Sequence, residues 1–163
     1  MQTPDLSFLQ VKIVSIGTAL FFCEDKSLLP FPAYIITALK TDEQGHIWFF
    51  ISRSRNKTVS YDLAFPANLE FYRKGYPFSL KIAGQASLVS DKEVMQDFMR
   101  DLLGKSIPVK EEAISGVILV KVKIEKADYK ELVPRKPYKP FQNIISSIKN
   151  VWYPVHPQLQ PSI

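Results

Sequence analysis

The sequence has little of the chemistry that metal sites and disulfides need. Cys23 is its only cysteine, so neither an intrachain disulfide nor a cysteine-based metal cluster can form within the chain. The two histidines, His46 and His156, have no companion ligand at a recognised metal spacing. The chain also has no Gly-rich phosphate loop and no Ser-His-Asp order of catalytic residues. Hydrolytic and metal-dependent activities are therefore poorly supported.

Long hydrophobic runs and export signals are also missing. No stretch approaches the roughly 18 apolar residues that a helix needs to span a bilayer. The first residues, MQTPDLSFLQVKIVS, lack the basic start, apolar run and small-residue cleavage site of a signal peptide. Together with the single cysteine, these absences predict a soluble, cytoplasmic protein without a membrane partner.

Acidic residues are absent from the last part of the chain. None follows Glu131, whereas four basic residues do, so this tail carries much of the net charge of +5. A basic tail is more often solvated than bound to an acidic partner, and we do not expect nucleic acid as a partner. Six prolines from Pro134 onward predict an extended tail, in which FQNIISSIKNVWY can form a helical turn or two against the body or a partner subunit. The four basic residues are Arg135, Lys136, Lys139 and Lys149.

The composition, with 46% apolar and 23% charged residues, is that of a globular protein, and we expect residues 1–133 to form one domain and residues 134–163 an extension. β-branched and aromatic residues dominate six runs separated by turn signals, which predicts consecutive antiparallel strands. In FSLKIAGQASLV the apolar residues from Phe78 to Leu88 alternate with polar ones, as in a strand with one buried face. The six expected strands are 16–23, 33–39, 46–52, 69–73, 78–89 and 116–127.

Helices are expected beside these strands. The apolar spacing of residues 6–13 predicts a short N-terminal helix. A capping box at residues 90–93 begins a second helix, which Gly104 ends. About six strands and two or three helices fit an antiparallel barrel of the α+β, mainly β, class. The apolar stripe of the second helix is Val94, Phe98 and Leu102.

The order of these segments resembles a known family. Between Ile16 and Asp97 the chain reads TALFFCED, AYIITALKTDEQGHIWFFISRSRNKTVSYDL, NLEFYRKG and SLKIAGQASLVSDKE. This order resembles the pyridoxamine 5′-phosphate oxidase-like split β-barrels, in particular their general stress protein branch, and the strongest match is DEQGHIWFFISRSRNK. The resemblance implies a six-stranded antiparallel split β-barrel that forms a homodimer. It also implies FMN in the cleft between the subunits, used in many members for two-electron redox chemistry.

The resemblance further implies which residues hold the flavin. In the family, the Ser or Thr that closes this strand and the Lys of the following turn contact the phosphate. A flavin needs apolar walls for its ring and donors for its phosphate, and a strand ending at a loop that opens a helix offers both. The backbone of the preceding strand edges the ring. Ser52 and Lys57 match the family's phosphate contacts, and Arg55 and Asn56 replace a Ser-Arg pair. The FMN-binding residues we expect are Tyr34, Ile35, Ile36, Thr37, Phe50, Ile51, Ser52, Arg55, Asn56 and Lys57.

Each of these residues also has an ordinary structural interpretation. A Ser/Arg/Asn/Lys cluster after a strand is, without the family, typical of a solvated loop. Trp48 and Phe50 are more typical of a barrel core or a dimer interface than of flavin contacts. Cys23 is typical of a buried strand position, because FFCED offers no positive charge to stabilise a thiolate.

Two positions depart from the family pattern. The second strand of the family commonly has an arginine before a proline that helps to hold flavin or substrate, and LLPFPAYII has none. Lys130, in DYKE, stands where the family often has tryptophan. Neither a substrate nor a catalytic acid or base follows from the sequence. The chain is therefore an FMN-dependent oxidoreductase of this type, a flavin-binding module without turnover, or a basic adaptor that has lost the flavin.

Overall fold

The fold is described from a computed structural model, which defines residues 4–25, 29, 31–54, 59–106 and 108–133. The chain divides into two compact units, Met1–Leu132 and Val133–Ile163. Of the second unit only Val133 is among the described residues, so the proline-rich extension and its basic residues stay a prediction. In the described part of the chain, no helix is long and apolar enough to cross a membrane.

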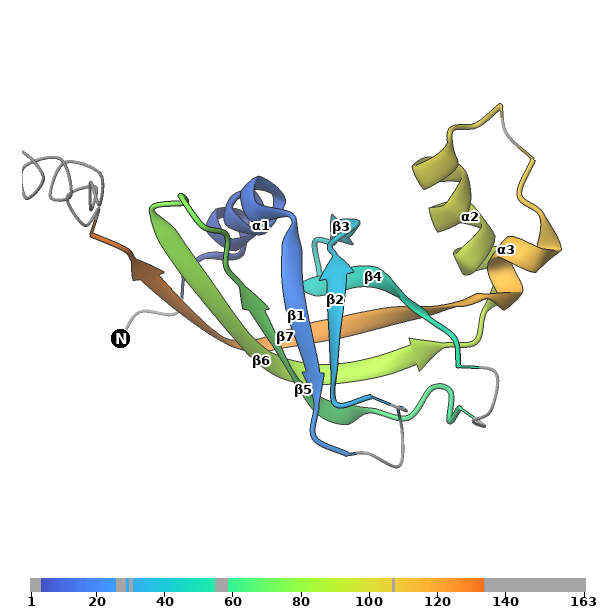
Figure 1. Cartoon of the computed structure of the whole chain (residues 1–163), viewed down its shortest axis with the longest axis horizontal. Coiled ribbons are helices and arrows are strands. Elements are labelled where there is room, and N and C mark those ends of the chain that lie inside the picture. The colour runs from blue at the N-terminus through green and yellow to red at the C-terminus, as the bar shows by residue number, and fades with distance from the viewer. Residues whose placement is uncertain (1–3, 26–28, 30, 55–58, 107, 134–163) are drawn as a thin grey trace, which may run out of the picture. The chain divides into compact units, whose positions relative to one another are not determined.

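Seven antiparallel strands form one curled sheet, in which the order of neighbours is β2-β1-β5-β6-β7-β4-β3 (Figure 1). The predicted α+β, mainly β, class is confirmed, but the strand count of six is wrong by one. The additional strand, β3, has only two residues, too few to leave a sequence pattern. The strands are β1 Thr18–Cys23, β2 Ala33–Thr37, β3 Lys40–Thr41, β4 His46–Ser52, β5 Phe65–Phe71, β6 Phe78–Val89 and β7 Val117–Glu131.

The chain between β2 and β3 explains why the sheet curls. These strands stand at opposite edges of the sheet, although only Ala38 and Leu39 separate them along the chain. The N–H of Ala38 donates to the carbonyl of Gly17, and the N–H of Leu39 donates to the carbonyl of Trp48, each at 2.8 Å. The two edges of the sheet therefore meet at Leu39, which makes a barrel of the sheet.

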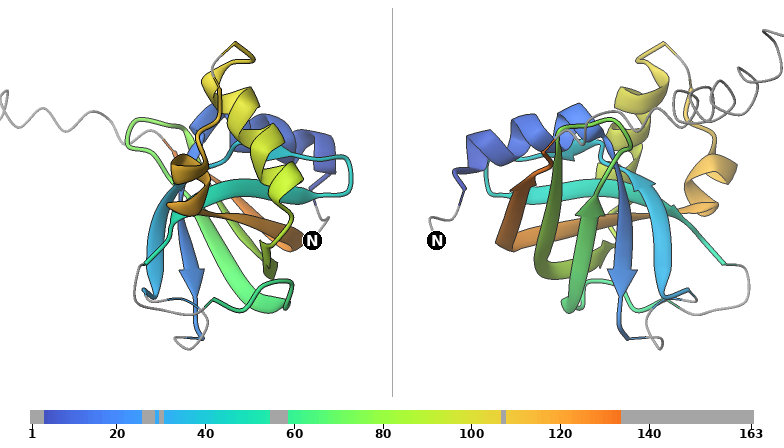
Figure 2. Two further views of the ribbon diagram at one scale, coloured as in Figure 1. Left: turned by 90° about the vertical axis from the view of Figure 1, so that its right-hand side faces the viewer. Right: turned by 60° about the vertical axis from the view of Figure 1, so that its left-hand side comes forward.

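Helix α1, Leu6–Ile16, covers one end of this barrel (Figure 2). It buries Leu9, Ile13 and Ile16 in the main core. The prediction that Ile16 begins the first strand is wrong, because the helix continues to this residue. The helix ends at Gly17, whose φ of 75° disfavours other residues and whose N–H donates to the carbonyl of Ile13 at 2.8 Å.

A lysine of α1 fixes the helix to the end of the barrel. The Nζ of Lys12 lies 5.2 Å from the ring centre of Phe8, 4.5 Å from that of Phe78 and 5.3 Å from that of Tyr129. The rings of Phe8 and Tyr129 also meet edge to face at 5.0 Å. Because each ring face is negative, the three rings stabilise the ammonium group without a carboxylate.

The main core lies inside the barrel and confirms the alternation read in β6. Phe78, Leu80, Ile82, Ala86 and Leu88 are all 4% exposed or less, and Gly84 is also buried. Two strand boundaries were predicted wrongly. β5 starts at residue 65 rather than 69, because the strand tolerates a proline at the exposed position 66. β7 continues to residue 131 because it pairs with the start of β6.

A β-bulge bends the two longest strands. Ala83 of β6 pairs with Lys126 of β7, whereas Gly84 pairs with Ile124, so one residue of β7 is left over. A Cβ atom at Gly84 would overlap the carbonyl oxygen of Lys123 and lie 2.9 Å from its carbonyl carbon. Glycine is therefore required for the backbones to approach this closely.

Helices α2, Lys92–Leu103, and α3, Glu111–Ser115, cover the outer side of β4 and the start of β7 (Figures 1 and 2). They pack on a second hydrophobic cluster built around Val89, Met95 and Leu119. Trp48 and Phe50 pack against this cluster, and the ring of Trp48 stacks on that of Phe98 at 5.0 Å.

Two details of α2 differ from the sequence interpretation. The residue at the N-cap is Asp91 rather than Ser90, because its Oδ1 accepts from the N–H groups of Glu93 at 2.9 Å and Val94 at 3.3 Å. The buried residues are Met95 and Met99, one position beyond the expected stripe, whose last member, Leu102, is 58% exposed. The helix is amphipathic as predicted, but it is rotated toward its methionines.

Candidate cofactor site

The expected flavin-binding strands face each other across a split in the barrel. β4 pairs with β7 along its whole length but with β3 only at Ile47 and Trp48. β2 stands at the edge of the sheet, with β1 as its neighbour. Cα atoms of β2 and β4 nevertheless approach within 8 Å. Two strand edges with unpaired N–H and C=O groups therefore line one opening, a suitable border for the heteroatoms of a planar ligand.

The residues predicted on β2 lie on this free edge. Ile36 is buried in the core at 2% exposure, whereas Ile35 is 84% exposed and Thr37 is also exposed. Tyr34 is half-buried, and its hydroxyl accepts from the N–H of Phe31 at 3.4 Å. Burial raises the pKa of the Tyr34 hydroxyl, so it is neutral at physiological pH. β2 is thus an edge strand, and the contact of its backbone with flavin stays a prediction.

The residues predicted on β4 point in two directions. The side chain of Ile51 is in the barrel core at 4% exposure, and that of Phe50 is half-buried against the cluster under α2. Ser52 is exposed at the end of the strand. Ser52 therefore ends β4, the strand that lies close to β2, and its contact with flavin stays a prediction. The remaining predicted residues, Arg55, Asn56 and Lys57, lie outside the described residues.

The segment after β4 is described in part. Its described residues, 53, 54 and 59–64, contain no helix, and residues 55–58, where the expected helix would begin, lie outside the described residues. Asp62 has a φ of 59°, which non-glycine residues rarely adopt. Its N–H donates to the carbonyl of Leu88 at 2.9 Å, and its carboxylate accepts from the hydroxyl of Ser90 at 2.6 Å. These bonds hold the chain in the strained conformation.

Arg53, which follows Ser52 directly, is an exposed cation that the sequence interpretation missed. Its N–H donates to the carbonyl of Gly116 at 3.0 Å, and its Nη2 donates to the hydroxyl of Tyr61. Among the described residues it forms no ion pair. In the sequence it is one of several cations in SRSRNK, and nothing in that pattern distinguishes it from Arg55.

Lys130, the residue in place of the family's tryptophan, is far from the split of its own chain. It is exposed on β7 opposite Ser79, whereas Val117 is the residue of β7 that pairs with Ser52. The 13 residues from Val117 to Lys130 correspond to about 40 Å along the strand at ~3.3 Å per residue.

One carboxylate holds the hairpin that begins β4. Oδ1 of Asp42 accepts from the N–H groups of Gln44 at 3.0 Å and His46 at 2.8 Å, and Oδ2 accepts from Nε1 of Trp48 at 2.9 Å. Nδ1 of His46 lies 3.1 Å from Oδ2. Burial opposes ionisation of Asp42, but these hydrogen bonds and the charge of His46 outweigh it and hold its pKa below the usual 3.8. The carboxylate thereby fixes Trp48 beneath α2.

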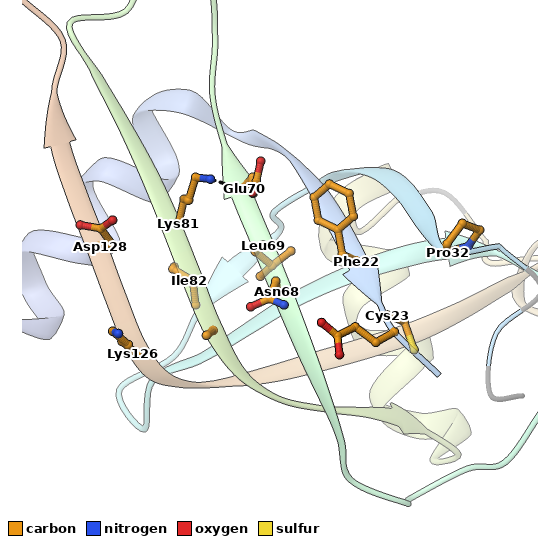
Figure 3. A pocket seen from close by; sticks show the side chains of 12 residues that line it. Phe22, Cys23, Pro32, Asn68, Leu69, Glu70, Lys81, Ile82, Lys126 and Asp128 are labelled. Carbon is orange, nitrogen blue, oxygen red and sulfur yellow. Dashed lines mark ion pairs between the residues drawn. The ribbon is translucent and has the colours of Figure 1, made fainter. Parts of the chain in front are cut away.

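A broad hollow of about 610 Å³ lies on the outer face of β1, β5, β6 and β7 (Figure 3). The Nζ of Lys81 and Oε1 of Glu70 form an ion pair of 3.0 Å within it. Cys23 lies at its border, and burial, with the nearby carboxylates of Asp25 and Glu24, raises the pKa of its thiol. In the described part of the chain, no three His, Cys, Asp or Glu side chains are grouped to hold a metal ion.

Comparison with known proteins gives matches in structure alone, since no family model and no curated protein matches the sequence. One of them is a protein from Xanthomonas campestris pv. campestris that is assigned to the general stress family. It superposes with a TM-score of 0.58 and 19% identity, over 81% of this chain and 92% of that one. The general stress FMN/FAD binding protein of Xanthomonas citri superposes with a TM-score of 0.53 and 18% identity, over 80% of this chain and 89% of that one.

A protein related to general stress protein 26, of the pyridoxinephosphate oxidase family, from Clostridium acetobutylicum gives a TM-score of 0.50 and 13% identity, over 78% of this chain and 91% of that one. At these identities the similarity is one of fold. The chain therefore has the split-barrel fold of the general stress and pyridoxamine 5′-phosphate oxidase-like proteins, as the resemblance in its sequence predicted.

Proposed function

We propose that the chain binds FMN across the split between β2 and β4 and is a flavin-dependent oxidoreductase of the general stress protein type. The observation that carries this proposal is the approach of two strands, β2 and β4, that lie close together without pairing. Both strands are the ones that the sequence resemblance assigns to flavin. The Xanthomonas citri protein of the same fold, which is described as FMN/FAD binding, supports a flavin as the ligand.

The residues at the split fit a flavin in their chemistry. The backbone of β2 offers donors and acceptors for the polar edge of the ring, and the exposed Ser52 offers a hydroxyl to the phosphate. We assign the remaining phosphate contacts to Arg55, Asn56 and Lys57. Bound flavin supplies the two-electron chemistry, while the chain supplies position and electrostatics. A binding module without turnover would use the same residues.

We further propose that two copies of the chain complete the site. Leu20 on β1 is 40% exposed, Phe31 just before β2 is 59% exposed, and Ile35 on β2 is 84% exposed. A second copy can bury this apolar surface. Leu20 pairs with Ile35 on one side and with Glu70 on the other, so this apolar surface continues into the hollow of Figure 3. The hollow contains charges of both signs, such as Lys126 and Asp128, which two copies could pair in an isologous dimer.

Flavin binding is tested by titrating the purified chain with FMN and with riboflavin. We expect the flavin fluorescence to be quenched, and Lys57→Ala to weaken FMN binding about tenfold or more with little effect on riboflavin, since a charge-assisted hydrogen bond contributes roughly 1.5–3 kcal/mol. Lys74→Ala removes the same charge from the exposed turn before β6 and serves as control. A chain that quenches no flavin fluorescence, or equal losses for the two ligands, would contradict the assignment.

Turnover and assembly need separate measurements. Anaerobic NADPH or NADH, or chemical reduction followed by candidate electron acceptors, should bleach and restore the spectrum of the bound flavin faster than that of free flavin. A rate equal to that of free flavin supports the binding module instead. Light scattering should give a dimer at micromolar concentration, and Leu20→Arg should give a folded monomer. A monomeric wild-type chain would refute the two-copy site.

A further inference from the structure

Two hollows follow one side of α2 and make a single groove. The first, of about 440 Å³, lies between α2, α3 and Arg53, and the second, of about 470 Å³, lies between α2 and the segment after it. Gln96 and Val109 line both hollows, so the two adjoin. Each has the volume of a small-molecule site. We call this feature the α2 groove; α2 and α3 face the viewer in the left view of Figure 2.

The α2 groove is positively charged because α2 separates its charges by face. Lys92, Gln96 and Arg100 are spaced i, i+4, i+8 and line the groove. The next stripe, with the same spacing, is acidic and exposed to solvent. This arrangement places the acidic side chains of α2 outside the groove. The residues of the acidic stripe are Glu93, Asp97 and Asp101.

The positive charge is concentrated at the two ends of the groove. Arg53 and Lys92 line the first hollow, where Glu111 is the acidic residue, and Arg100 and Lys105 line the second. In the part of the chain that the structure defines, only Arg100 of these four cations forms an ion pair, at 3.2 Å with the exposed Asp97. Lys92 and Arg100 are eight residues apart, about 12 Å along the helix.

The first end is preorganised by its neighbours. The guanidinium carbon of Arg53 lies 5.9 Å from the ring centre of Tyr61, and its Nη2 donates to the Tyr61 hydroxyl. Tyr61 is itself half-buried against the main core, and the neighbouring Asp62 has a positive φ maintained by bonds to Leu88 and Ser90. A guanidinium already fixed in this way loses little freedom when it binds a phosphate, for which its planar fork is suited.

We propose that the α2 groove binds a nucleotide that carries phosphate groups at two separate places. Its diphosphate lies against Arg53 and Lys92, and its second phosphate lies against Arg100 and Lys105. Met95, Val109 and Ile114 supply the apolar wall for a nucleoside between the phosphates. The proposal concerns binding alone. Of these residues, Arg53 directly follows Ser52 of the FMN site proposed above, whereas Lys92, Arg100 and Lys105 belong to α2 and the segment after it.

NADP⁺ and NAD⁺ are matched probes for this groove, because they differ by one phosphate. Isothermal titration of the full chain, as purified and with its flavin content measured separately, should give a dissociation constant for NADP⁺ about tenfold lower than for NAD⁺, the scale of one charge-assisted contact. Amide resonances of Gln96 and Ser115 should shift in ¹⁵N spectra of the wild-type chain. This second measurement needs no variant and so does not depend on whether a variant folds.

Three variants locate the two phosphates. Arg53→Gln should raise the dissociation constants of both ligands about tenfold, whereas Arg100→Gln should raise that of NADP⁺ alone and remove the preference. Lys74→Gln, which removes a charge away from the groove, should change neither. Equal affinity of the wild type for the two ligands would overturn the proposal. A loss of affinity in Lys74→Gln as large as in Arg53→Gln would also overturn it. Stronger competition by a poly-glutamate peptide than by NADP⁺ would overturn it as well and would indicate an acidic protein partner.

Discussion

Replacing Gly84 by alanine tests whether the β-bulge is required for the barrel. The added Cβ would meet the backbone of β7, with the carbonyl carbon of Lys123 at 2.9 Å and the backbone nitrogen of Glu125 at 3.3 Å, as well as overlapping the Lys123 oxygen. A flexible side chain could rotate away from a new methyl group, but a paired strand cannot. Either β6 and β7 separate locally, or the bulge is lost and their register shifts.

The expected cost follows from the kind of clash. Inserting one carbon into a packed core typically destabilises a protein by about 1–3 kcal/mol through displaced side chains. Because the obstacle at Gly84 is backbone, we expect the top of this range, about 3 kcal/mol. For a chain of this length about 1 kcal/mol shifts the melting temperature by roughly 2–4 °C, so the expected loss is about 6–12 °C.

The assay compares two glycine-to-alanine variants by urea unfolding and thermal melting. Gly116 is the matched control, because its φ is −83° and the atom nearest to an added Cβ, the carbonyl oxygen of Glu112, is 3.6 Å away, an ordinary contact. Gly116→Ala should change the free energy of unfolding by less than about 1 kcal/mol. If Gly84→Ala were as mild as this control, the bulge would not constrain the barrel.

Two other perturbations test contacts that position the site. Asp42→Asn should reduce the free energy of unfolding at pH 7 by about 1–3 kcal/mol, since the hydrogen bonds of the hairpin lose their charged acceptor. The folded pKa of Asp42 lies below 3.8, so the stability that this carboxylate contributes is present above pH 3.8 and is lost as the pH falls through the folded pKa. The difference in the free energy of unfolding between variant and wild type should therefore shrink in acid. Unfolding curves at pH 7 and below pH 4 check this, and a constant difference would contradict it. Lys12→Met keeps the apolar stem but removes the charge that faces the three rings. It should reduce the free energy of unfolding by about 0.5–2 kcal/mol and lower the melting temperature accordingly. Lys130→Met, at an exposed position, is the control. Equal melting temperatures for the two variants would show that the ammonium group contributes nothing there.

The parts of the fold that depend on one strand or helix were predictable from the sequence. The alternation in β6 and the Asp42–Gly45 turn follow from local patterns that the structure confirms. The parts that depend on tertiary packing were not. β3 exists because the sheet edges meet at Leu39, and no two-residue pattern announces this. In α2, positions 94 and 98 and positions 95 and 99 are all apolar, so only the strands beneath decide which pair is buried.

The candidate site shows the same limit. Its two strands came from a family resemblance, because nothing within residues 34–37 or 50–52 indicates that they face each other. That proximity follows from barrel closure, which involves the whole sheet. The α2 groove was missed for a related reason. Its cations belong to the segment after β4, to α2 and to the segment after α2, and the folded chain alone brings them together.

The second hydrophobic cluster has a consequence for how the chain opens. Its buried members are only Val89, Met95 and Leu119, separate from the large core inside the barrel. The other side chains of this layer, among them Trp48 and Phe98, are only partly buried. The layer can therefore detach while the barrel stays folded, and the amides of α2 should exchange with deuterium through a partial opening of lower free energy than global unfolding. A ligand in the α2 groove binds only the closed form, and should therefore slow exchange in α2 while leaving the slowest amides of β6 unchanged.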